Sequence, residues 1–133
     1  MTHTFALPSR DLQELVTLPP VNVDLLTEQC LGNLPFAITL LEEFAKTSQS
    51  RIEAMETHLA NGDFISLADL IHGLSGVVGI LGANILWELT TTLQSAAEEQ
   101  NATISSSLLP ILRAEMNRLC DYIPTVRALA KRN

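Results

Sequence analysis

Apolar side chains recur every three or four residues along most of the chain from Val23 onward. This spacing places them on one face of an α-helix, whereas a half-buried β-strand alternates apolar and polar residues. We find no segment with the alternating pattern. The sequence therefore predicts an all-α protein.

Turn-forming and capping residues divide the helical pattern into one short helix and four long ones. The short helix is expected from Val23 to about Leu31, before Gly32. The long helices are expected over residues 33–61, 63–81 and 83–101, and from a serine-rich turn at 105–107 to the end of the chain. Pro110 then falls in the first turn of the last helix, where its missing N–H is harmless, and Pro124 should kink or loosen the final turns.

Four amphipathic helices joined by short loops bury their apolar faces most simply in an antiparallel bundle. We therefore expect an antiparallel four-helix bundle with a short additional N-terminal helix, spanning residues 23–133. Residues 1–22 contain three of the six prolines and are predicted to be a leader or linker. Within it, only Ser9–Val16 has the pattern of a short helix.

Composition and charge narrow the classes of partner. Hydrophobic residues make up 47% of the chain and aromatic residues 5%, so Leu and Ile must fill most of the core. The formal net charge is −7, and no Lys or Arg occurs between Arg51 and Arg113, which argues against a nucleic-acid partner. The apolar runs are short and interrupted, so we expect no membrane insertion. Cys30 and Cys120 form no CxxC motif and are expected to be reduced core residues of a cytoplasmic protein.

The helix expected over residues 63–81 carries an outward-facing histidine. Advancing about 100° per residue gathers its apolar side chains within an arc of roughly 120°. These are Leu67, Leu70, Ile71, Leu74, Val77, Val78 and Leu81. His72 lies about 170° from the centre of that arc and therefore points away from the core.

Very small or short side chains surround this histidine on the helix surface. The expected neighbours are Ala68, Asp69, Gly73, Ser75, Gly76 and Gly79. Each glycine in a helix costs roughly 1 kcal/mol relative to Ala, so we expect a compensating role, namely close approach of another surface to the ring. A lone surface histidine is more often simply solvated, and glycines at this spacing also serve helix packing. The glycines lie opposite the apolar stripe, which disfavours the packing explanation.

The stretch from Leu70 to Ala83 resembles the signature of histidine-containing phosphotransfer (HPt) domains, which reads roughly H-x-L-K-G-x-x-x-x-x-G-A. The matching residues are His72, Leu74, Gly76, Gly82 and Ala83, and Asn61–Phe64 is similar to the family's loop before the active helix. The resemblance covers the chain from about Val23 to Ala130. It implies a monomeric four-helix bundle that carries a phosphoryl group on His72.

The resemblance also implies the setting in which the chain works. The phosphoryl group would be accepted from an aspartate of one receiver domain and passed to another, in a hybrid sensor kinase or a response regulator. The chain would then be a phosphotransfer intermediary rather than an enzyme on its own, with no cofactor and with Mg²⁺ held by the receiver. Such a domain stands free or forms the cytoplasmic C-terminal part of a membrane-bound sensor histidine kinase.

One position departs from the family pattern. Ser75 occupies the place of the usual Lys, so its hydroxyl replaces an ammonium that would meet the phosphoryl oxygens. We expect either that Lys46, Arg51 or Arg113 reaches the site from a neighbouring helix, or that the phosphorylated form depends more on the partner.

Two other functions remain alternatives at this point. The bundle could be a docking adaptor that binds a receiver or kinase domain without carrying phosphate. It could also be a metal-dependent enzyme, because Asp69 and His72 are spaced like half of a di-iron ligand pair. That site needs ligands converging inward from several helices, whereas His72 is expected to point outward, so we predict no metal site.

Overall fold

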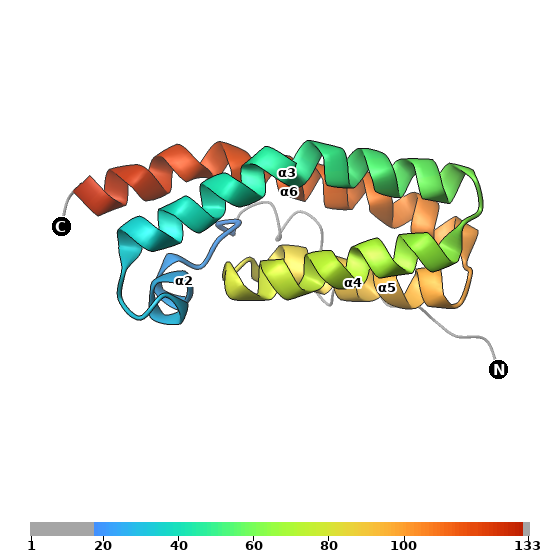
Figure 1. The fold of residues 1–133 in the computed structure, drawn as a ribbon, viewed down its shortest axis with the longest axis horizontal. Helices are drawn as coiled ribbons and strands as arrows, with labels where there is room; N and C mark the ends of the chain where they lie inside the picture. The colour runs from blue at the N-terminus through green and yellow to red at the C-terminus, as the bar shows by residue number, and fades with distance from the viewer. Residues whose placement is uncertain (1–17, 132–133) are drawn as a thin grey trace.

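A computed structural model describes residues 18–131 of the protein, and its helices form a four-helix bundle with one short extra helix (Figure 1). The helices are α2 (Val23–Gln29), α3 (Leu34–Ala60), α4 (Phe64–Ile80), α5 (Asn84–Glu98) and α6 (Ala102–Lys131). No β-strand occurs within residues 18–131. The all-α class and the bundle predicted from the sequence are confirmed. The helix expected over Ser9–Val16 lies outside the described residues.

The four long helices run alternately up and down, and each packs against two others. Helix α3 lies on α4 and α6, and α5 lies on the same two helices, which closes a ring around the core (Figure 1). Helices α3 and α6 extend beyond α4 and α5 at one end, where the short α2 packs against α3. The α4–α5 pair therefore forms one side of the bundle.

Local capping explains where the helices begin. The side chains of Asn33 and Asp63 accept hydrogen bonds from the backbone N–H of Phe36 and Ser66, respectively, at 3.0 and 3.1 Å. Each bond satisfies one of the amide groups that a helix start leaves without a partner. Pro35 lies in the first turn of α3, where no N–H is required. Helices α3 and α4 therefore begin where the sequence pattern predicted, next to residues 33 and 63.

The turn between α4 and α5 requires glycine for two reasons. Gly82 has a φ of +70°, which a residue with a Cβ adopts only under strain. A Cβ at this position would also lie 2.9 Å from the carbonyl oxygen of Asn22. The N–H of Asn22 in turn donates to the Gly82 carbonyl at 2.9 Å, so the segment before α2 is bonded to this turn.

The predicted start of the last helix was wrong. Helix α6 begins at Ala102, because the Asn101 side chain accepts a hydrogen bond from the N–H of Ile104 at 3.0 Å. The serines at 105–107 are helical, not a turn, and the Ser107 hydroxyl donates to the Thr103 carbonyl one turn earlier. Pro110 consequently lies inside the helix on its exposed side, beyond the first turn. The helix also continues through Pro124.

The core is built mainly from Leu and Ile, as the composition predicted. On α4, the fully buried side chains are Leu67, Ile71, Leu74 and Val78, all members of the predicted stripe. Cys30 is buried and Cys120 half-buried, and both are free thiols. None of the helices in the described part of the chain is both long and apolar enough to cross a membrane.

Candidate functional site

His72 lies in the middle of α4 with its side chain exposed to solvent. The side chains that bury α4 occupy the opposite side, so the core fixes the helix and leaves the imidazole outside. Asp69, Gly76 and Gly79 are exposed around it, and Ser75 is half-buried. The predicted orientation of His72 is therefore correct.

The glycines leave open space beside the ring. A Cβ built on Gly73 or on Gly76 would meet no atom of residues 18–131 within 4 Å. Packing among these residues therefore does not require either glycine. On this side of α4, the surface next to His72 is low and accessible, with Ala68 half-buried one turn before it.

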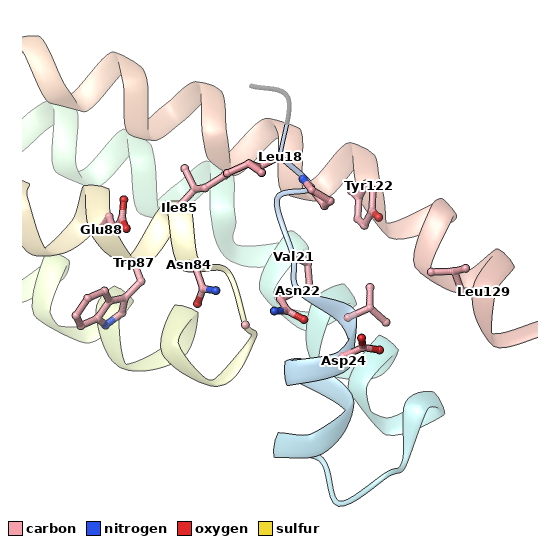
Figure 2. A pocket seen from close by; sticks show the side chains of 13 residues that line it. Leu18, Val21, Asn22, Asp24, Asn84, Ile85, Trp87, Glu88, Tyr122 and Leu129 are labelled. Carbon is pink, nitrogen blue, oxygen red and sulfur yellow. The ribbon is translucent and has the colours of Figure 1, made fainter. Parts of the chain in front are cut away.

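Helix α5 completes the site with a residue that the sequence analysis missed. The side-chain Nε2 of Gln94 lies 3.4 Å from Nδ1 of His72. Seven residues earlier on the same side of α5, the Trp87 indole lies against α4, at 3.8 Å from where a Cβ on Gly79 would be (Figure 2). These two contacts show the register of the antiparallel helices: residue 79 lies opposite residue 87, and residue 72 opposite residue 94.

Gln94 orients the imidazole and leaves one ring nitrogen available. Nδ1 faces the Gln94 amide, whereas Nε2 of His72 forms no hydrogen bond with any residue in the range 18–131. With the amide N–H donating to Nδ1, the neutral ring carries its proton on Nε2. If the Gln94 side-chain amide is flipped by 180°, Oε1 accepts a hydrogen bond from a protonated Nδ1, and Nε2 then carries a lone pair. The ring is a nucleophile at Nε2 only in this second tautomer.

Among residues 18–131, helices α4 and α5 bring no cation of their own to the histidine. Helices α4 and α5 contain no Lys or Arg. The Ser75 hydroxyl donates to the backbone carbonyl of His72 at 2.7 Å, so it is already engaged within the helix. The charged groups next to the site are acidic. Asp69 precedes His72 by three residues on α4, and Oε2 of Glu98 lies 3.5 Å from Nε2 of Gln94, the residue that contacts the ring.

The three cations considered as substitutes for the usual Lys have other partners. Lys46 pairs with Glu43 at 3.0 Å, and both residues belong to α3. Arg113 of α6 pairs with Glu56 of α3 at 2.6 Å. Arg51 donates from Nε to the Thr47 hydroxyl, also on α3. The structure thus does not bring these residues together with His72.

Within residues 18–131, no group of three or more His, Cys, Asp or Glu side chains is arranged to hold a metal ion. Asp69 and His72 both lie on the solvent side of a single helix. A carboxylate–histidine metal site of the bundle type needs ligands from facing helices in the interior. The geometry of this pair is therefore not that of a di-iron ligand pair.

A pocket of about 710 Å³ lies at the other end of α5, between the segment before α2 and helix α6 (Figure 2). Leu18, Val21, Ile85 and Tyr122 provide much of its apolar lining. His72 is not among the residues that line it, whereas Trp87 both lines it and lies beside Gly79 of α4. The pocket is therefore separate from the exposed histidine.

Comparison with known proteins identifies the family. The family model described as the Hpt domain matches residues 39–122, which is more than half of the chain and includes all of α4 and α5. The protein belongs to the HPt family. No curated protein and no solved structure matches the chain.

Membership defines the general role. HPt domains are helical bundles that act as phosphotransfer intermediates in two-component phosphorelays, and they interact with receiver domains. The predicted family and the general function in phosphorelay signalling are therefore confirmed.

Proposed function

We propose that His72 accepts a phosphoryl group from the aspartate of one receiver domain and passes it to the aspartate of another. The observation that carries this proposal is the exposed imidazole at the centre of the α4–α5 surface, beside Gly73 and Gly76, where a Cβ would contact no other part of residues 18–131. Phosphoryl transfer depends mostly on positioning and charge stabilisation, which the receiver and its metal ion can supply. The chain then needs only an accessible nucleophile.

The transfer step uses the nitrogen that faces away from Gln94. The Nε2 lone pair attacks phosphorus, an N–P bond forms, and the P–O bond to the aspartate breaks, which releases a carboxylate. The ring keeps its proton on Nδ1 throughout, and Nδ1–H donates a hydrogen bond to Gln94 Oε1 once the side-chain amide has flipped by 180°. In the second half, a carboxylate of another receiver attacks phosphorus and Nε2 leaves. Mg²⁺ held by the receiver would supply the charge that neutralises the phosphoryl oxygens, and we expect no cofactor on the chain itself.

The experiment combines phosphotransfer with a matched histidine control. His72→Gln and His58→Gln would be incubated with a set of phosphorylated receiver domains, and the products analysed by mass spectrometry under alkaline conditions, where phosphoramidates survive. His58 lies on α3 and pairs with Asp63 at 3.5 Å, so its substitution tests a second, partly exposed imidazole. We expect labelling of the wild type and of the His58 variant, and none of His72→Gln. Undiminished labelling of His72→Gln would refute the assignment.

The same assay separates transfer from simple docking. A receiver that binds the bundle but never labels it would support the adaptor function instead.

We further propose that the chain works as a cytoplasmic monomer, free-standing or as part of a hybrid sensor kinase, and that residues before Val23 act as a linker to the bundle.

A further inference from the structure

Charge is distributed very unevenly between the two sides of the bundle. Helices α3 and α6 contain every Lys and Arg of the described residues, six in all, together with six Asp and Glu residues. Residues 61–101, which include α4 and α5, contain five acidic residues and no Lys or Arg. The α3–α6 side is thus balanced, and the α4–α5 side is purely acidic.

Two of these acids flank the histidine. Asp69 lies one turn before His72 on α4, and Glu98 lies one turn after Gln94 on α5. Both side chains are exposed, and neither forms an ion pair with a Lys or Arg of the described chain. Their charges are therefore available to a partner that approaches the ring.

Apolar side chains stand on the same two helices. Trp87 of α5 is 47% exposed and packs beside Gly79 of α4. Ile80, the residue after Gly79, is 53% exposed. At the other end of α4, Ile65 is 76% exposed, seven residues before His72 and thus on the same side of the helix. Large apolar groups exposed together on two helices are typical of a protein-binding surface.

We propose that this surface selects receiver domains whose phosphorylation site is surrounded by an apolar patch with Lys or Arg at its rim. We define the transfer face as Ile65, Asp69, His72, Gly76, Gly79, Ile80, Trp87, Gln94 and Glu98. The rim cations would meet Asp69 and Glu98, while Trp87 and Ile80 enter the apolar patch. The inference rests on the proposed function of His72 and adds which receivers that site accepts.

The charge pattern argues for a basic partner and against a second copy of the chain. Opposite charges accelerate encounter, and like charges placed opposite each other oppose binding. Two copies meeting through this face would each present Asp69 and Glu98 with no Lys or Arg from α4 or α5 to pair with them. A receiver with an acidic rim faces the same repulsion.

The test compares two receivers against one phosphorylated donor. The probes are a purified receiver domain with Lys or Arg around its aspartate, and its variant with those residues changed to Glu. His72 is first phosphorylated chemically with phosphoramidate, and transfer rates to the two receivers are measured at low and high salt. Taking the ratio of the two rates cancels any change in the donor's own stability.

We expect the basic receiver to react roughly tenfold faster at low salt, and the ratio to shrink at high salt because exposed charges are screened. The double variant Asp69→Lys with Glu98→Lys should reverse the preference. Asp69→Asn with Glu98→Gln should abolish it without introducing positive charge. The control Glu53→Lys with Asp121→Lys makes the same change in net charge on α3 and α6 and should keep the wild-type ratio.

The outcomes separate this inference from the proposed function. Transfer that occurs at equal rates to both receivers, or a ratio changed equally by the control variant, would overturn the charge selection and leave His72 as the phosphoacceptor. A dimer that forms through the transfer face, detected by analytical ultracentrifugation and lost in Trp87→Ala, would also overturn it. Failure of His72 to take up phosphate at all would overturn both.

Discussion

The replacement of Ser75 by Lys is the most informative single change, because it restores the cation that the family pattern has and that this chain lacks. Ser75 lies one turn after His72 on α4, a spacing at which two side chains meet on a helix surface. Its hydroxyl is bonded only to the backbone of the same helix among the described residues, so its loss should cost little. A Lys at this position can extend over the phosphoryl group on His72.

The expected gain is modest because the site is open to water. Two unit charges 4 Å apart interact by about 1 kcal/mol in water, and a phosphoryl group carries more than one negative charge. Ordering a long side chain offsets part of this, and exposed ion pairs are worth about 0.2 to 1 kcal/mol in total. About 0.5 to 1 kcal/mol corresponds to a two- to fivefold shift in an equilibrium. We therefore expect Ser75→Lys to move the equilibrium toward phospho-His72 by that factor.

The assay measures the equilibrium ratio of phosphorylated receiver to phosphorylated bundle, because a ratio is independent of how the new Lys alters docking rates. Ser75→Gln is the matched control, since it adds length without charge, and it should leave the ratio unchanged. A ratio that does not move for Ser75→Lys, or that moves toward the phosphorylated receiver, would contradict the reasoning. It would mean that another cation already serves the phosphoryl group when the receiver is bound.

Three further changes test the docking surface, the turn and a helix cap. Gly76→Leu should slow phosphotransfer at least about tenfold while the helix content stays intact, because the added side chain projects into open space and Leu favours a helix. The control Gly76→Ala should transfer normally. A normal rate for the Leu variant would show that the glycine is not there to let the receiver approach His72. Gly82→Ala should lower the free energy of unfolding by about 1 to 3 kcal/mol in urea, because of its positive φ and the close Asn22 carbonyl, and an unchanged midpoint would contradict this. Hydrogen bonds from Ser66 lower the pKa of Asp63 below its ordinary value of 3.8. The ionised cap therefore contributes stability above that pH, and the contribution is lost as the pH falls through the lowered pKa. The stability of Asp63→Asn, measured by acid unfolding, should depend less on pH around and below 3.8 than that of the wild type.

Much of the architecture could be predicted because it depends on local pattern. The caps at Asn33 and Asp63 act within one turn of the helix that they begin, and the apolar stripe of α4 follows from helical periodicity alone. The outward orientation of His72 follows from the same periodicity. These features need no knowledge of the other helices, which is why they agree with the structure.

The start of α6 could not be predicted because two local signals competed. Serines at 105–107 are typical of a turn, but Asn101 is an equally good cap, and Ser105 is completely buried in the bundle. Packing of the preceding turn against the core decides in favour of the earlier cap. Once the helix begins at Ala102, Pro110 is forced into its interior.

The composition of the site depended on relations between helices that are distant in sequence. Periodicity places His72 on the surface, but only the antiparallel register of α4 and α5 brings Gln94 to its Nδ1. In the same way, the packing of α6 against α3 places Arg113 beside Glu56 and not beside His72. A helix pattern reports the direction in which a side chain points, whereas the partner that it meets depends on how whole helices slide and pack, which is settled by the core as a whole.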